Sequence, residues 1–149
     1  MKKFFSLVAL GLALASSTFA AGDSGVAKDA EALVQKAVKH LAAAGKDKAL
    51  ADFGTPTWVD RDVYLVVLDF NGIVVAHGTN PKLIGKDFMG VKDVDGVAFT
   101  AAMVETAKTK GKGWTDYKFT DPTTKKVLPK ASYCEKAGEL AVCAGIYKR

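Results

Sequence analysis

Several aromatic and hydrogen-bonding residues stand in or beside the apolar segments of this chain. Lys130 and His77 can offer charge-assisted hydrogen bonds to a carboxylate, and a tyrosine hydroxyl can add another donor. Binding pockets are typically apolar and aromatic, with a few polar groups aimed inward. Such residues also fill ordinary cores, so the pattern alone leaves pocket and core both open. The set is Tyr64, Phe70, His77, Trp114, Tyr117, Lys130, Tyr133 and Tyr147.

The chemistry open to this set is binding rather than catalysis. The chain has no G-x-S-x-G elbow, no H-E-x-x-H or C-x-x-C-H motif and no phosphate-binding glycine loop. Asp69 lies near His77 in sequence, but no nucleophile accompanies it, and it fits better as a residue leading into a turn. The acidic segment 93–96 has the wrong register for an EF-hand. We therefore expect no enzyme activity, no cofactor and no metal.

A hairpin around Asn71-Gly72 must position the first of these residues. Two apolar, β-branched runs flank this dipeptide, and Asn-Gly is the strongest short-range signal of a hairpin with a type I′ turn. In that register Val66 faces His77 and Leu68 faces Val75, which puts His77 at the rim of an apolar surface. Because the runs are nearly continuous in apolar residues, the sheet should be covered on both faces.

The other elements follow from periodicity and from the residues that interrupt it. Apolar spacing predicts helices at 27–44 and 97–110 and a short helical turn at 46–53, with Trp58 plugging the core beyond it. Strands are expected at 114–120, 127–135 and 140–147. No β-α-β alternation is present, so the fold class is α+β with a five-stranded antiparallel sheet.

The two cysteines predict a disulfide. In an oxidising compartment a disulfide is the default state of such a pair. A tight turn at Gly138-Glu139 would place Cys134 directly opposite Cys143 and staple one hairpin. A redox-active pair is the less favoured alternative, and the spacing matches no zinc site.

The N-terminus predicts export. Lys2 and Lys3 precede an apolar run, and Thr18-Phe19-Ala20 suits a cut before Ala21, so residues 1–20 read as a signal peptide. We expect one domain over 21–149, located in the periplasm, with no membrane anchor after cleavage. Losing two lysines lowers the formal net charge from +5 to +3. The remaining lysines are interrupted and predict a solvated surface rather than a nucleic-acid site.

Short segments in a fixed order give the chain a family resemblance. They are VYLVVLDFNG at 63–72, AHG at 76–78, NP at 80–81, LIGK at 83–86, KD at 92–93, DG at 95–96, GW at 113–114 with Tyr117, Pro122, Lys130 with Tyr133, and AGIY at 144–147. Together they resemble the single Cache domain family, the extracytoplasmic PAS-like sensor modules of bacterial chemoreceptors and histidine kinases.

The resemblance implies a fold and a site. It implies a long N-terminal helix on a five-stranded antiparallel sheet, with a pocket between the sheet and the segment that carries the second helix. Family members of this type commonly bind acetate, propionate, lactate or pyruvate. Strict strand alternation puts Tyr133 on the face opposite Lys130, unless a bulge intervenes. The implied ligand-binding residues are His77, Trp114, Tyr117, Lys130 and Tyr133, with Tyr64 and Phe70 as lining.

Two features depart from the usual family member. The domain is normally bracketed by two membrane helices that drive a cytoplasmic output, whereas only a removable signal peptide is predicted here. The pair Cys134 and Cys143 is also unusual for the family.

The leading hypothesis is a periplasmic protein that binds a short organic acid and docks on a membrane receptor or sensor kinase. The alternative is a ligand-free interaction module. The family resemblance also allows a homodimer through the helix at 27–44.

Overall fold

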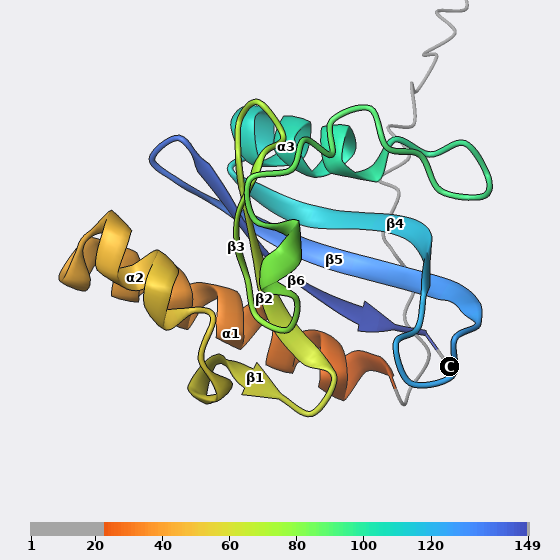
Figure 1. The fold of residues 1–149 in the computed structure, drawn as a ribbon, viewed down its shortest axis with the longest axis horizontal. Helices are drawn as coiled ribbons and strands as arrows, with labels where there is room; N and C mark the ends of the chain where they lie inside the picture. Colours follow the sequence, from red (N-terminus) through yellow and green to blue (C-terminus); the bar gives the residue numbers. More distant parts are fainter. Residues whose placement is uncertain (1–22, 149) are drawn as a thin grey trace, which may run out of the picture.

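The computed structural model describes residues 23–148 and consists of an antiparallel sheet with helices on both faces (Figure 1). The helices are α1 (Asp23–Ala44), α2 (Lys46–Asp52) and α3 (Phe99–Lys110), with 3-10 turns η1 (Pro56–Trp58) and η2 (Pro81–Leu83). The strands are β1 (Val59–Asp60), β2 (Val63–Asp69), β3 (Val74–His77), β4 (Lys112–Thr120), β5 (Val127–Ala137) and β6 (Leu140–Tyr147). The predicted α+β class is confirmed, and the predicted cleavage site and signal peptide lie outside the described residues.

The sheet contains the five predicted antiparallel strands. Strands β4, β5, β6 and β2 are neighbours in that order, and β3 pairs with β2. The sequence did not predict β1, a two-residue strand that also pairs with β2. Helices α1 and α3 end where the sequence predicted, because α1 stops before Gly45 and α3 stops at the left-handed Gly111 (φ 80°).

The β2–β3 hairpin forms, but the predicted type I′ turn is wrong. Val66 faces His77 as expected, whereas a register shift places Leu68 opposite Val74 instead of Val75. Of the central dipeptide only Gly72 adopts a positive φ, +82°. The turn is a three-residue loop because the Asp69 carboxylate Oδ1 accepts hydrogen bonds from the backbone N–H of Asn71 and of Ile73, each at 2.9 Å. This side chain stabilises a type I turn followed by a left-handed glycine.

Each face of the sheet has its own core. On one face α1 packs on the sheet, around Val34, Phe53 and Trp58, and this confirms that Trp58 plugs the core. On the other face α3 covers the sheet through Phe99, Met103 and Val104. Figure 1 shows the two helices on opposite sides of the strands. The nearly continuous apolar runs of β2 and β6 are explained by this double cover.

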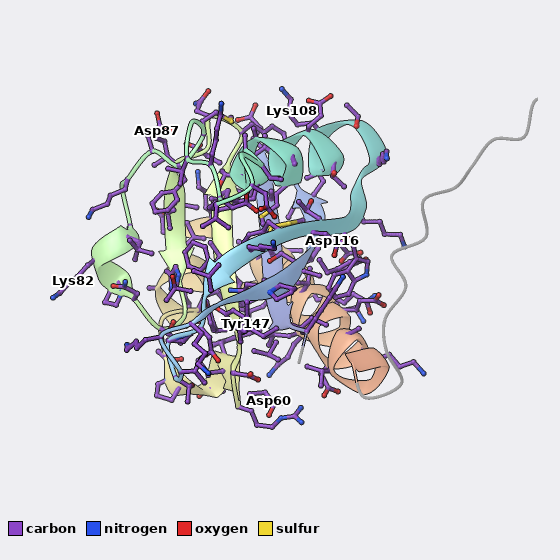
Figure 2. All side chains as sticks on the ribbon, turned by 90° about the vertical axis from the view of Figure 1, so that its right-hand side faces the viewer. Asp60, Lys82, Asp87, Lys108, Asp116 and Tyr147 are labelled. Carbon is purple, nitrogen blue, oxygen red and sulfur yellow. A yellow bond between two sulfur atoms is a disulfide. The ribbon has the colours of Figure 1, made fainter. Side chains whose placement is uncertain are left out.

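Charged side chains gather on the outside of the molecule. Lys82 and Asp87 project from the segment between β3 and α3, and Lys108 projects from α3 (Figure 2). The interrupted lysines of the sequence are exposed, as predicted: Lys108, Lys110, Lys112, Lys125 and Lys126. Within residues 23–148, no helix combines the length and the apolar character needed to cross a membrane.

The predicted disulfide is present. Strands β5 and β6 turn at Gly138-Glu139, which sets Cys134 opposite Cys143, and the two sulfur atoms are bonded. Both cysteines are buried beneath α3.

Replacing Cys134 and Cys143 together with alanine should lower the free energy of unfolding by about 2–3 kcal/mol, the chain-entropy value for so short a loop. The fold should survive, because the β5–β6 ladder continues on both sides of the bridge. Urea unfolding of the oxidised wild type and the double variant measures the difference. Coincident unfolding curves would show that the bridge does not stabilise the fold.

Candidate functional site

A cavity of about 60 Å³ lies on the α3 side of the sheet, bordered also by residues between β3 and α3. Four of the residues singled out from sequence line it together: Tyr64, His77, Tyr117 and Lys130. The remaining walls are mainly apolar. They consist of Val66, Leu68, Val74, Leu83, Phe88, Phe99, Thr100, Met103, Phe119, Ser132, Cys143, Ala144 and Gly145.

Lys130 brings a cation to this cavity. The side chain is only 5% exposed, and its Nζ donates a hydrogen bond to the Tyr64 hydroxyl at 3.2 Å. The ammonium also lies over the rings of Tyr147 (4.7 Å to the centroid) and Tyr64 (5.0 Å). Burial lowers the pKa of Lys130 to about 8, and the charges of Asp62 and Asp121 oppose this shift. The lysine is therefore mostly charged at neutral pH although it is desolvated.

Gly145 leaves the space through which Lys130 reaches the cavity. It stands in β6 directly opposite Ser132 of β5, and Lys130 precedes Ser132 on the same face. A Cβ at position 145 would lie 2.6 Å from Lys130 Cε and 2.6 Å from Ser132 Oγ. No side chain can therefore be added there unless both neighbours move.

His77 ends β3 and supplies a neutral ring. Its Nδ1 accepts hydrogen bonds from the backbone N–H of Asn80 (3.0 Å) and of Thr79 (3.3 Å). The proton of the neutral ring therefore resides on Nε2, which can donate to a ligand. Burial, with a smaller contribution from the charge of Lys130, lowers the pKa of His77 to about 4. The ring stacks at a tilt on Tyr64, 5.1 Å between centroids.

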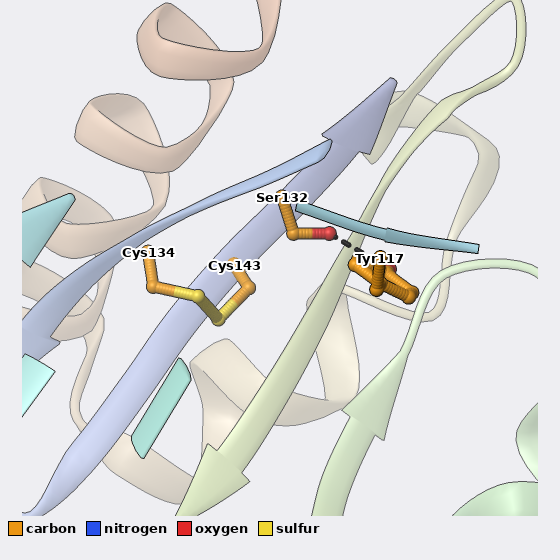
Figure 3. The surroundings of a disulfide bond; sticks show 4 residues. All are labelled: Tyr117, Ser132, Cys134 and Cys143. Atoms are coloured by element: carbon orange, nitrogen blue, oxygen red, sulfur yellow. Dashed lines mark hydrogen bonds between the residues drawn. A yellow bond between two sulfur atoms is a disulfide. The ribbon is translucent and has the colours of Figure 1, made fainter. Parts of the chain in front are cut away.

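Tyr117 closes the cavity on the β4 side. Its hydroxyl shares a 2.9 Å hydrogen bond with Ser132 Oγ, close to the disulfide (Figure 3). Its ring is stacked on Phe99 of α3 with centroids 4.7 Å apart. Burial raises the pKa of Tyr117 well above its ordinary value, so the residue remains a neutral, rigid wall.

The charge balance of the cavity favours an anion. Among the described residues that line it, Lys130 is the one charged group and there is no carboxylate. His77 is neutral because its pKa is lowered. A buried cation without an acidic neighbour in the same cavity can be neutralised by a bound anion.

Three of the predicted ligand-binding residues lie away from this cavity. Trp114 and Tyr133 face α1 on the opposite side of the sheet. The indole Nε1 of Trp114 donates to Glu31 Oε1 at 3.0 Å, and the Tyr133 hydroxyl donates to Glu135 at 3.2 Å. Strands β4 and β5 pair regularly, without a bulge. Because successive side chains point to opposite faces of a strand, Trp114 lies on the face opposite Tyr117, and Tyr133 on the face opposite Lys130. Phe70 stands in the β2–β3 turn and borders a different hollow.

Trp114→Phe therefore tests which face the ligand uses. We expect it to lower the free energy of unfolding by about 1 kcal/mol, because the hydrogen bond to Glu31 is lost, and to leave ligand affinity unchanged. Denaturant unfolding and calorimetric titration of the same preparation report the two quantities separately. A large loss of ligand affinity at unchanged stability would show that Trp114 contributes to ligand binding.

Sequence reasoning missed several residues of the cavity. Ser132 and Phe119 could have been found by alternation, because they lie two positions from Lys130 and Tyr117 on the same strands. Phe99 and Thr100 come from the first turn of α3. Their position depends on how the helix packs across the sheet, and no local pattern reveals it.

Comparison with known proteins places this chain in a family. The family model described as "Single Cache domain 2" matches residues 17–144. A methyl-accepting chemotaxis protein from Vibrio parahaemolyticus RIMD 2210633 shares the fold, with a TM-score of 0.71 and 23% identity over 84% of this chain and 90% of that one.

Two further solved structures are similar over nearly their whole length. A periplasmic sensor domain of a chemotaxis protein has a TM-score of 0.65 and 25% identity over 87% of this chain and 94% of its own. A Cache chemosensory domain whose structure is described as the basis for carboxylic acid recognition has a TM-score of 0.70 and 27% identity, covering 87% and 99%. With the long N-terminal helix, the antiparallel sheet and the match over most of its length, this chain belongs to the single Cache domain 2 family of sensor domains.

Proposed function

We propose that this protein is a periplasmic sensor-type protein that binds a short carboxylate of two to four carbon atoms and takes part in chemotaxis or signal transduction. The observation that carries the proposal is Lys130, a buried cation in a mainly apolar cavity. The ligand's carboxylate would rest on the Lys130 ammonium and the His77 Nε2–H, with Tyr117 as an aromatic wall.

The energetics of burial support this assignment. Taking an ammonium out of water is costly unless it is paired, and the lowered pKa of Lys130 reflects that cost. A carboxylate at Lys130 would replace the lost hydration with a charge-assisted hydrogen bond, which is about twice as strong as a neutral one. An apolar ligand would leave the ammonium without an anionic partner in the cavity.

The size of the cavity supports a short acid. A water molecule needs roughly 10–15 Å³ of such volume, so a cavity of about 60 Å³ has room for about four to six non-hydrogen atoms. Acetate, propionate, lactate and pyruvate fall within this range. An amino acid with a long side chain or a purine exceeds it.

The similar structures support a role in chemotactic sensing. Two of the similar structures are chemotaxis sensor proteins, and the third is described by carboxylic acid recognition. The disulfide is typical of an oxidising compartment such as the periplasm. A membrane receptor or sensor kinase is the proposed partner, and a second copy of the chain could pair through α1.

A thermal-shift screen of the oxidised protein tests the function. The panel contains carboxylates of two to four carbons, amino acids and purines, and mass spectrometry first confirms that no ligand has co-purified. A ligand at about one hundred times its Kd adds roughly 2.7 kcal/mol, which should raise Tm by several degrees. We expect the shift only with short carboxylates. A flat screen on folded protein would favour a ligand-free interaction module instead.

Affinity should also depend on pH through Lys130. The free protein must carry a proton on Lys130 to bind the anion, and its pKa is about 8. Because a short carboxylate stays ionised in this range, Kd should be nearly constant below about pH 7 and rise about tenfold per pH unit above 8. Calorimetric titrations with propionate at several pH values measure this slope. A Kd that stays level up to about pH 9.5 would contradict the role of Lys130.

A further inference from the structure

Thr100, in the first turn of α3, borders the cavity. Its side chain is 2% exposed, and Phe99 and Met103 of the same helix border the cavity beside it. The helix begins after Ala98 without a side-chain cap. The positive end of α3 and a threonine hydroxyl therefore meet at this wall.

The other hydroxyl groups of the cavity are engaged, and the Thr100 hydroxyl is not. Tyr117 is bonded to Ser132, and Tyr64 accepts from Lys130. Within residues 23–148, Thr100 has no hydrogen-bond partner for its hydroxyl. In the same part of the chain, every side-chain nitrogen or oxygen that is sealed from solvent has a partner. The Thr100 oxygen is therefore not sealed from solvent, and Thr100 is one of the residues that line the cavity.

A buried hydroxyl left without a partner costs free energy, which a ligand oxygen can recover. We propose that Thr100 is a specificity-determining residue that hydrogen-bonds a hydroxyl or oxo oxygen on the carbon chain of the ligand. The preferred ligand is then a hydroxy or oxo acid of two or three carbons, such as glycolate, lactate or pyruvate. This inference rests on the proposed function, since Lys130 and His77 hold the carboxylate of the same molecule.

The size and polarity of the cavity disfavour the nearest alternatives. A second carboxylate on a longer acid such as succinate needs more than the roughly four to six non-hydrogen atoms that fit. An unsubstituted acid fits but leaves Thr100 unpaired. Sites built to hydrogen-bond a ligand oxygen reject the analogue that lacks it far more strongly than apolar pockets reject an extra methylene.

Calorimetric titration of matched acids tests the inference. Wild-type protein is titrated with propionate, lactate and pyruvate, which share a three-carbon chain, and with acetate and glycolate. We expect at least one oxygen-bearing acid to bind about tenfold more tightly than its unsubstituted counterpart. Thr100→Val has nearly the same shape without the hydroxyl, and it should abolish this preference, so that each oxygen-bearing acid binds no more tightly than its unsubstituted counterpart.

Two matched variants guard against a purely structural effect. Thr100→Ser retains the hydroxyl and should retain the preference. Thr106→Val makes the same substitution on α3 away from the cavity and should leave every affinity unchanged. A preference that persists in Thr100→Val, or a wild type that binds no oxygen-bearing acid more tightly than its unsubstituted counterpart, overturns the inference but not the proposed function. A wild type that binds none of the acids overturns both.

Discussion

Replacing Lys130 with methionine should weaken binding of a short carboxylate by about two orders of magnitude and leave the fold intact. Removing one member of a buried, hydrogen-bonded charge pair costs roughly 2–5 kcal/mol of binding free energy. Methionine keeps an unbranched, apolar side chain among the rings of Tyr64, Phe119 and Tyr147 that now surround the ammonium. The change therefore removes the charge more than the packing.

The same variant should be more stable than the wild type without ligand at neutral pH. The folded-state pKa of Lys130 is lowered from 10.5 to about 8, so its charged form destabilises the folded state by roughly 3 kcal/mol. This penalty is full below about pH 8 and disappears as the pH rises towards 10.5, where the unfolded chain alone still holds the proton. Lys130→Met should remove the penalty, and urea unfolding at neutral and alkaline pH measures it.

A surface lysine provides the control for Lys130. Lys126→Met makes the same chemical change at an exposed site and should alter neither affinity nor unfolding. If Lys130→Met binds propionate or lactate as tightly as the wild type does, Lys130 does not hold the ligand and the proposed site is wrong.

Gly145→Ala should have the second-largest effect, through sterics rather than charge. The new Cβ would stand 2.6 Å from Lys130 Cε and from Ser132 Oγ, so both side chains must leave their positions. Overpacking of this kind typically costs about 1–3 kcal/mol of stability. We also expect carboxylate affinity to fall at least tenfold, because the ammonium no longer points to its place in the cavity. Titration and urea unfolding of the same preparation report both losses.

Gly90 offers a matched control for Gly145. A Cβ at Gly90 would meet no heavy atom within 4 Å, and its φ is not in the left-handed region. Gly90→Ala should therefore be neutral in both measurements. Wild-type affinity in Gly145→Ala would mean that Lys130 can shift without loss, which contradicts a preorganised cation.

Local chemistry predicted most elements of the fold from the sequence. Gly138-Glu139 set the β5–β6 register and with it the disulfide, and apolar periodicity located α1 and α3. The turn of the β2–β3 hairpin was mispredicted because the Asp69 side chain competes for the backbone N–H groups. The preference of Asn-Gly for a type I′ turn does not take this competition into account.

The site was predictable only in part. Lys130, His77, Tyr117 and Tyr64 are brought together as expected. Trp114 and Tyr133 are not, since a regular ladder without a bulge sends them to the α1 face. Their aromatic character suits a core as well as a pocket, and only strand parity separates the two. Thr100 depends on helix packing, which leaves no signal in the sequence.

The most direct test of the central claim compares each short acid with its neutral amide. Propionate and propionamide, and lactate and lactamide, match closely in shape and differ in charge. If the buried Lys130 ammonium holds the ligand, calorimetry should show one binding site per chain for at least one acid. The corresponding amide should bind about 100-fold more weakly or not at all. Equal binding of acid and amide, or no binding of either acid, would contradict the account.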